Sequence, residues 1–284
     1  MILPNFLVIG GQRCGTTLLH TILAAHDEVY VPPRRKEIHY FDYEDRFARS
    51  LDWYRAFFPA DEDAGRYRAI GEVTPDYLFE PKVPPRIAQV LPDCRLVAVL
   101  RNPVDRAFSG YLHHVRAFGE RRSFEQFIEQ QEDAKQRGFY TEQLQRYLEL
   151  FGPGKLHILI FEELLRSPAD NLRGLAGFLE LSRPWRNPQE LIGTPINSGA
   201  TPRFHTAFRK ARRLGEVLSE IGLDRAVTLA KEVGLPKVFG TRPDPPRLSA
   251  ESRDRLREAY RSEIAALEQL LGRPIAAWQH EGSA

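Results

Sequence analysis

The chain has 284 residues, of which 42% are hydrophobic, so it can bury a substantial core and is not expected to be disordered. Forty basic and thirty-eight acidic residues leave a net charge of only +2, which argues against a nucleic-acid coat protein or a polybasic membrane binder. The two cysteines, Cys14 and Cys94, form no CxxC pair, so neither a disulfide framework nor a structural metal centre is expected.

The first expected strand is the apolar run at residues 6–9. It begins within a few residues of Met1, which leaves no room for a secretory signal peptide. No apolar run approaches the roughly 20 residues that a membrane span needs. We therefore expect a soluble, cytoplasmic protein with no transmembrane segment and no nucleic-acid partner, while its oligomeric state stays open.

Two more apolar runs, residues 96–100 and 156–161, are typical of buried parallel strands. Helical patterns are interspersed with the three strands and cover residues 17–25, 84–91, 104–118 and 141–151. Alternating strands and helices predict an α/β fold, a three-layer sandwich with a central parallel sheet. Ligands of such sheets bind at the carboxyl ends of the strands.

The pattern changes from Arg203 onward, where apolar residues recur at helical spacing. A proline-rich hinge at residues 243–246 precedes a final helix expected over residues 249–272. No domain boundary is evident. We therefore expect a single domain over residues 1–284, in which a C-terminal helical cap covers about 203–245 together with the last helix.

The stretch GGQRCGTT, residues 10–17, lies between the first strand and the first helix. In this context backbone N–H groups and the helix N-terminus form an anion cradle, which makes the expected fold similar to that of P-loop NTPases. A glycine-rich turn without a ligand is the alternative for the loop taken alone. The residues expected to bind the anion are Arg13, Cys14, Gly15, Thr16 and Thr17.

A P-loop kinase or other NTPase is the first competing hypothesis. Such an enzyme would carry lysine at the position of Thr16 and a magnesium-holding acid at a strand end. The second strand instead ends at Arg101, and only Glu162 and Glu163, after the third strand, could imitate that acid. A non-catalytic nucleotide-binding module is the second competing hypothesis.

The loop and several later stretches resemble the sulfotransferases that use 3′-phosphoadenylyl sulfate (PAPS). The heparan-sulfate-type members and many bacterial relatives usually carry lysine where this chain has Arg13, and tyrosylprotein sulfotransferases carry arginine there. The stretch LRNPVDRAFSGY, residues 100–111, matches the 3′-phosphate motif of the family, which implies that Arg101 and Ser109 are ligands. Arg203, in a loop rich in small residues, is the candidate for closing on the same phosphate.

The stretch RRKEIHYFDYE, residues 34–44, resembles the Lys-Glu-x-His-Phe-Phe segment of the heparan-type members. The resemblance implies that Glu37 is the general base and that Lys36 and His39 orient it or the sulfuryl oxygens. The stretch GEVTPDYLF also matches the family, and in it Glu72 either pairs with a nearby cation or lines the acceptor cleft.

The resemblance implies an enzyme of bacterial type that moves a sulfuryl group from PAPS to a hydroxyl or amine by in-line displacement and releases 3′,5′-ADP (PAP). The sequence leaves the acceptor open between a carbohydrate, a lipid, another small molecule and a protein tyrosine. Such chemistry uses electrostatic stabilisation and implies no metal, and the eight histidines show no metal-binding spacing.

Overall fold

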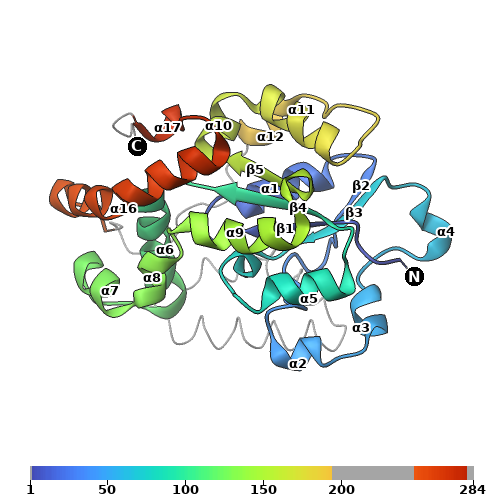
Figure 1. Ribbon diagram of the computed structural model, residues 1–284, viewed down its shortest axis with the longest axis horizontal. Helices are drawn as coiled ribbons and strands as arrows, with labels where there is room; N and C mark the ends of the chain where they lie inside the picture. The colour runs from blue at the N-terminus through green and yellow to red at the C-terminus, as the bar shows by residue number, and fades with distance from the viewer. Residues whose placement is uncertain (1, 194–245, 280–284) are drawn as a thin grey trace, which may run out of the picture. The chain divides into compact units, whose positions relative to one another are not determined.

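The computed structural model of the protein describes residues 2–193 and 246–279 (Figure 1). The predicted cap at residues 203–245, with Arg203, lies outside these residues. The chain divides into two compact units. The first contains Met1–Arg106, Arg137–Ile196 and Ala259–Ala284, and the second contains Ala107–Gln136 and Asn197–Glu258.

A five-stranded sheet with the order β2-β3-β1-β4-β5 forms the centre of the first unit, and every strand pairing in it is parallel. Its strands are β1 (Phe6–Gly10), β2 (Val29–Tyr30), β3 (Ala69–Val73), β4 (Arg95–Leu100) and β5 (Leu156–Ile160). The prediction of a central parallel sheet is confirmed. All residues of β1 and β3 are buried, as expected for strands covered on both faces.

The strands β2 and β3 were not predicted. Only two residues form β2, and the apolar pattern of β3 is interrupted by Gly71 and Glu72. Gly71 lies opposite Phe6 of β1, and a Cβ atom there would collide with the carbonyl oxygen and ring of Phe6. Close strand packing therefore explains a glycine that looked like a strand breaker in the sequence.

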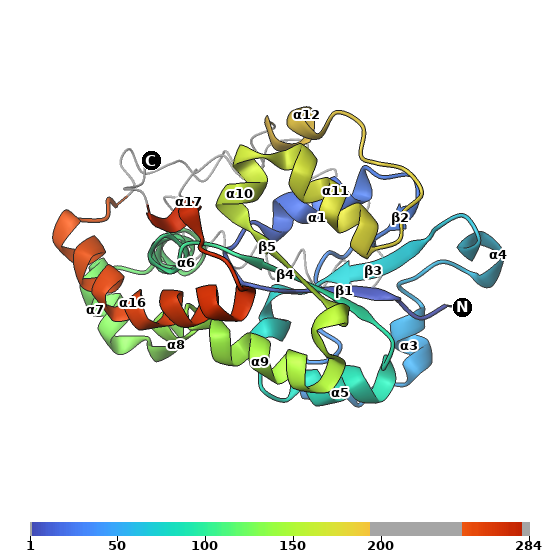
Figure 2. The same cartoon turned by 45° about the horizontal axis from the view of Figure 1, so that its top comes forward.

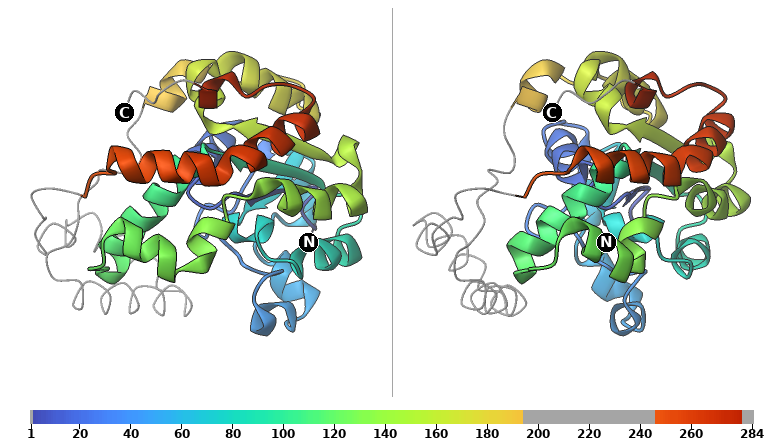
Figure 3. Two further views of the ribbon diagram at one scale, coloured as in Figure 1. Left: turned by 60° about the vertical axis from the view of Figure 1, so that its left-hand side comes forward. Right: turned by 90° about the vertical axis from the view of Figure 1, so that its left-hand side faces the viewer.

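Helices cover both faces of this sheet, as the three-layer prediction requires (Figure 2). One face carries α1 (Thr16–Ala24), α10 (Phe161–Arg166), α11 (Pro168–Phe178) and α12 (Pro188–Gly193), and the other carries α5 (Val83–Val90) and α9 (Tyr140–Phe151). Figure 3 shows the same separation, with the yellow helices α11 and α12 at the top of both views. Four predicted helices are thus confirmed: α1, α5, α9 and α6 (Pro103–Phe118), each within one residue of its expected ends.

Shorter elements complete the first unit. They are α2 (Glu44–Phe47), α3 (Leu51–Arg55), α4 (Asp61–Ala64), the 3-10 helices η1 (Pro75–Leu78) and η2 (Pro153–Lys155), and α17 (Ala276–Gln279). The long helix α16 (Ala250–Leu271) confirms the prediction of a final helix over residues 249–272. Within the described ranges, no helix combines the length and the apolar character needed to cross a membrane.

The second unit contains most of α6 together with α7 (Phe124–Gln130) and α8 (Glu132–Gln136). A capping box between Ser123 and Gln126 begins α7. Tyr111 packs against this helix, with its ring centroid 5.5 Å from that of Phe124, and its hydroxyl donates a hydrogen bond of 2.8 Å to the carbonyl oxygen of Arg122.

Candidate active site

The loop at residues 10–17 leaves the sheet at the carboxyl end of β1 and enters α1. Arg13 and Gly15 both adopt left-handed backbone conformations, with φ angles of 68° and 88°. The Gly11 N–H donates to the carbonyl oxygen of Val99 on β4 at 2.6 Å, which holds the start of the loop against the sheet. The loop therefore combines a sharp turn with the N-terminus of a nine-residue helix, the arrangement that attracts anions.

Gly15 is required in this turn for two reasons, and Gly15→Ala is expected to lower the free energy of unfolding by about 1–3 kcal/mol. Its φ of 88° strains any residue with a side chain, and a Cβ atom there would collide with the ring of Phe161. Urea denaturation measures the loss. Gly154→Ala is the matched control, since a Cβ atom at Gly154 meets nothing within 4 Å. Equal stability of the two variants would contradict the strain argument.

Lys36 connects the anion loop with the segment 34–44. Its ammonium donates hydrogen bonds to Thr16 Oγ1 at 3.3 Å, to Thr17 Oγ1 at 3.1 Å and to Glu37 Oε1 at 3.0 Å. The structure thus brings together four residues that the sequence singled out separately. The position where an NTPase loop carries lysine holds Thr16, and the ammonium group comes to it from another part of the chain.

Glu37 begins a row of three charged groups that continues through His39 to Asp42. His39 Nε2 lies 3.5 Å from Glu37 Oε2, and His39 Nδ1 lies 2.6 Å from Asp42 Oδ2. Burial disfavours the charged form of Glu37, but hydrogen bonds and charges from His39 and Lys36 outweigh it and lower the pKa of Glu37 to about 2. Burial likewise opposes charging of His39, yet Asp42 and Glu37 raise its pKa to about 9. At neutral pH Glu37 is therefore a carboxylate and His39 an imidazolium.

Asp42 was not singled out from the sequence, although it lies in the quoted segment three residues after His39. It is 4% exposed. The local signal was the His-x-x-Asp spacing, which in a segment without helical periodicity does not indicate contact. His39 has a φ of 57°, and this left-handed turn is part of the irregular backbone that makes the spacing hard to interpret.

His39→Asn is expected to destabilise the protein by an amount that shrinks as the pH rises. Because the pKa of His39 is raised from 6.5 to about 9, its stabilising contribution is complete below pH 6.5 and is lost as the pH rises through about 9. Urea denaturation of wild type and variant at about pH 6 and about pH 9.5 measures the difference.

The matched control for this measurement is His157→Asn. Burial lowers the pKa of His157, so its contribution should grow rather than shrink as the pH rises. If the difference between wild type and His39→Asn stayed constant over the same range, His39 would not be an imidazolium in the folded protein.

Cys14, inside the loop, and Arg101, directly after β4, are joined through Tyr140. The Tyr140 hydroxyl donates to the carbonyl oxygen of Arg101 at 2.8 Å and lies 3.6 Å from the Cys14 sulfur. Cys14 is fully buried, and this burial raises the pKa of its thiol. The Arg101 guanidinium lies over the ring of Phe161, 5.4 Å from its centroid. The Cys14 side chain thus belongs to the core, so only its backbone can serve an anion.

Ser109 lies half-buried on α6, in the part of that helix that belongs to the second unit. Arg203 lies outside the described residues. The assignment of Arg101, Ser109 and Arg203 to a 3′-phosphate therefore stays a prediction from the sequence.

Glu162 and Glu163 hold the C-terminal segment. Glu162 accepts a hydrogen bond from the N–H of Asn102 at 2.9 Å and another from the indole of Trp278 at 2.8 Å. Glu163 receives both terminal nitrogens of Arg273, at 2.8 and 2.7 Å. All four carboxylate oxygens thus have protein donors, which weakens the interpretation of either residue as the magnesium acid of an NTPase.

Glu72 takes neither of the two positions expected for it. It is fully buried and accepts hydrogen bonds from three hydroxyls, those of Tyr54 at 2.7 Å, Thr74 at 2.7 Å and Tyr77 at 3.1 Å. Its burial raises the pKa of the carboxyl. Glu72 therefore joins β3 to its aromatic surroundings inside the core, where its burial keeps it from lining an open cleft. It forms no ion pair with any cation among the described residues.

One group of described residues has the composition of a metal site, because ligand atoms of His39, Asp42 and Asp76 lie within 4.8 Å of one another. Both ring nitrogens of His39, however, face carboxylates. The geometry fits an ion-pair relay better than a metal centre.

Comparison with known proteins agrees with this geometry. The family model "Sulfotransferase domain" matches residues 3–192. The human bifunctional heparan sulfate N-deacetylase/N-sulfotransferase 2 is 31% identical over 199 residues, covering 63% of this chain and 22% of the relative. Its bovine counterpart is 29% identical over 303 residues, covering 98% of this chain and 31% of the relative. The chain thus spans only about a fifth to a third of these curated relatives.

Among solved structures, a sulfotransferase from Alicyclobacillus acidocaldarius is similar over 99% of this chain and 100% of its own. The TM-score is 0.68 and the sequence identity is 26%. The match confirms the predicted α/β fold. With the family model covering two thirds of the sequence, the resemblance found in the motifs is also confirmed, and the chain belongs to the sulfotransferase family.

Proposed function

We propose that the protein is an enzyme that moves a sulfuryl group from PAPS to a hydroxyl or amine acceptor and releases PAP. The observation that carries the proposal is the set of hydrogen bonds from Lys36 to Thr16, Thr17 and Glu37. These bonds place the Lys36 ammonium in contact with two anion-binding hydroxyls and with an ionised carboxylate. Family membership supports the same reaction.

On the donor side, the loop N–H groups, Thr16 and Thr17 would hold the 5′-phosphosulfate at the N-terminus of α1. Arg13 and Lys36 would stabilise the negative charge that develops on the bridging oxygen as the bond to sulfur breaks. Arg101, with Ser109 and Arg203 as the resemblance implies, would bind the 3′-phosphate. None of these steps requires a metal ion.

On the acceptor side, Glu37 would take the proton while the acceptor oxygen or nitrogen attacks sulfur in line with the leaving group. A carboxylate with a pKa of about 2 is a weak base, and Lys36 is one cause of that low value. When the Lys36 ammonium turns to the sulfuryl oxygens, Glu37 loses a hydrogen bond and its proton affinity rises. Donor binding would thereby activate the base, while the His39 imidazolium keeps it in place.

The experiment that tests this function is a comparison of PAP and ATP binding by calorimetry without magnesium. The proposal expects clear binding of PAP and a preference for it over ATP. A preference for ATP would instead favour the kinase or NTPase alternative. Formation of PAP from PAPS in the presence of acceptors then separates the enzyme from a non-catalytic nucleotide-binding module.

The acceptor, the compartment and the domain organisation are three further points that we propose. The relatives are named for N-sulfation of heparan sulfate, so carbohydrates are the acceptors to test first, ahead of lipids and other small molecules. Cytoplasmic location and a bacterial type stay predictions from the sequence. The family model runs through residues of both compact units, which supports a single sulfotransferase domain over residues 1–284.

A further inference from the structure

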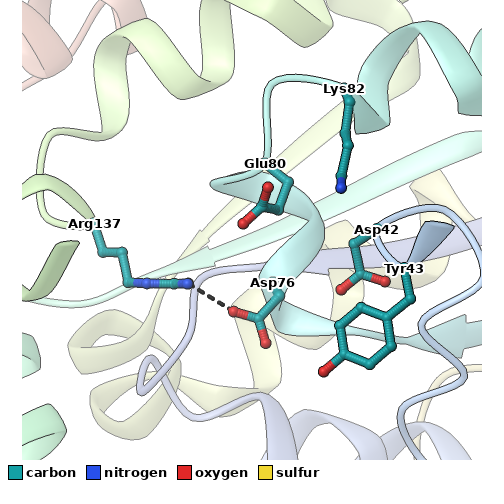
Figure 4. A pocket seen from close by; sticks show the side chains of 6 residues that line it. All are labelled: Asp42, Tyr43, Asp76, Glu80, Lys82 and Arg137. Atoms are coloured by element: carbon teal, nitrogen blue, oxygen red, sulfur yellow. Dashed lines mark hydrogen bonds and ion pairs between the residues drawn. The ribbon is translucent and has the colours of Figure 1, made fainter.

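A pocket of about 340 Å³ lies next to the charged row of the active site (Figure 4). It is lined by Asp42, Tyr43, Asp76, Glu80, Lys82 and Arg137, all in the first unit. Asp42 belongs both to this pocket and to the row that ends at Glu37. A group bound beside Asp42 would therefore be separated from Glu37, the proposed base, by the imidazole ring of His39.

Asp42 brings an unsatisfied hydrogen-bond acceptor to this pocket. Its Oδ2 atom is held by His39, but its Oδ1 atom is buried and has no donor among the described residues. A buried carboxylate oxygen without a donor is costly, by about 1–3 kcal/mol or more, and is rare in native proteins. The side chain is 2% exposed, so bulk water satisfies it poorly. A ligand group with an N–H or O–H donor would supply the missing hydrogen bond to Oδ1.

The charges of the pocket favour a positively charged donor. Three carboxylates, on Asp42, Asp76 and Glu80, face two basic side chains. Arg137 is already paired with Asp76 at 2.7 Å, as the dashed line in Figure 4 shows, and Lys82 donates to Glu44 at 2.8 Å. Glu80 forms no side-chain hydrogen bond or ion pair with any residue that the structure describes. The lining side chains by themselves therefore sum to one negative charge, and Glu80 is the carboxylate among them that has no basic partner within the described residues. Asp42 is paired with His39 but keeps one acceptor oxygen without a donor.

Gln12 of the anion loop connects the pocket to the donor side of the site. Its side-chain amide donates to Asp76 Oδ1 at 3.3 Å, the same oxygen that Arg137 contacts. The loop that would hold the donor and the pocket that would hold the acceptor thus share one carboxylate. This continuity fits a pocket that positions part of the acceptor.

We propose that this pocket binds an ammonium group of the acceptor, which makes the acceptor an amine-bearing molecule. The inference rests on the proposed function and deepens it. The ammonium would donate to Asp42 Oδ1 and to Glu80, and it is not the attacking group, because a protonated nitrogen has no lone pair. The same carboxylates would disfavour polyanionic acceptors.

Acceptor binding to the full chain saturated with PAP tests the inference, measured by calorimetry. The probes are a glucosamine tetrasaccharide and its fully N-acetylated counterpart, which has the same sugar chain without ammonium groups. We expect the glucosamine probe to bind more tightly. Glu80→Gln should weaken its binding about tenfold, the size of one charge-assisted hydrogen bond, and leave the N-acetylated probe unchanged.

Glu149→Gln is the matched control, because Glu149 is exposed on α9, does not line the pocket, and loses the same charge. Equal binding of the two probes, an equal effect of both variants, or tighter binding of a sulfated tetrasaccharide would overturn the inference. So would tight binding of Mn²⁺ that Glu80→Gln or Asp76→Asn abolishes, because the pocket would then be a metal site. Loss of PAP binding would refute the proposed function instead, so the two failures are distinguishable.

Discussion

Glu37→Gln is expected to lower the rate of sulfuryl transfer by about a thousandfold, within the range of general-base contributions, while PAP binds as it does to the wild type. The amide keeps the shape of the side chain and can still accept from Lys36, but it cannot take a proton. Steady-state kinetics measure the rate, and calorimetry with PAP measures nucleotide binding. The difference between the two measurements separates catalysis from binding.

Glu129→Gln serves as the control for Glu37→Gln, because Glu129 is an exposed carboxylate paired with Arg255 and lies in the other compact unit. Its transfer rate should stay close to that of the wild type. A non-catalytic module would tolerate both changes equally. Full transfer activity in Glu37→Gln would therefore remove Glu37 from the mechanism and leave the family motif without a base in this segment.

Lys36→Ala is expected to lower kcat/KM by about 10²–10³-fold, the loss typical of a donor that stabilises charge in the transition state. The change removes the ammonium that contacts Thr16, Thr17 and Glu37. PAP binding should fall much less, because PAP lacks the sulfuryl group. Pre-steady-state kinetics with PAPS, together with PAP titration, measure the two effects.

The pH profile of Lys36→Ala adds a readout that a structural role would not change. Lys36 lowers the pKa of Glu37, so the acidic limb of the profile should move to higher pH in the variant. Lys155→Ala is the control, since the polar contacts of Lys155 within the described part of the chain are with the carbonyl and side chain of Asp93. If transfer, PAP binding and the acidic limb all stayed as in the wild type, the ammonium would have no part in the reaction.

Local sequence patterns were sufficient for the loop, for three of the five strands and for five of the described helices. The loop GGQRCGTT, three strands, and the helices α1, α5, α6, α9 and α16 follow from contiguous residues, because apolar periodicity, prolines and glycines act over a few positions. The strand β3 was missed because the reason for its glycine lies in Phe6, more than sixty residues earlier in the chain.

The features of the site also fall into those that the sequence identified and those that required the structure. Sequence motifs alone identified Lys36, Glu37 and His39 as candidates, since family resemblance depends only on the order of residues. Their contacts with Thr16, Thr17 and Asp42 required the folded chain, as did the paired carboxylates of Glu162 and Glu163.

By itself, the sequence determined the fold class, the family and the chemical types available for an anion and a base. Only the tertiary structure decided that an ammonium from residue 36 reaches the loop and that Asp42 presents an unsatisfied oxygen to a pocket. The physical reason is that hydrogen bonds, charge pairing and burial depend on distances between segments far apart in the chain, whereas propensity and motif depend on neighbours along it.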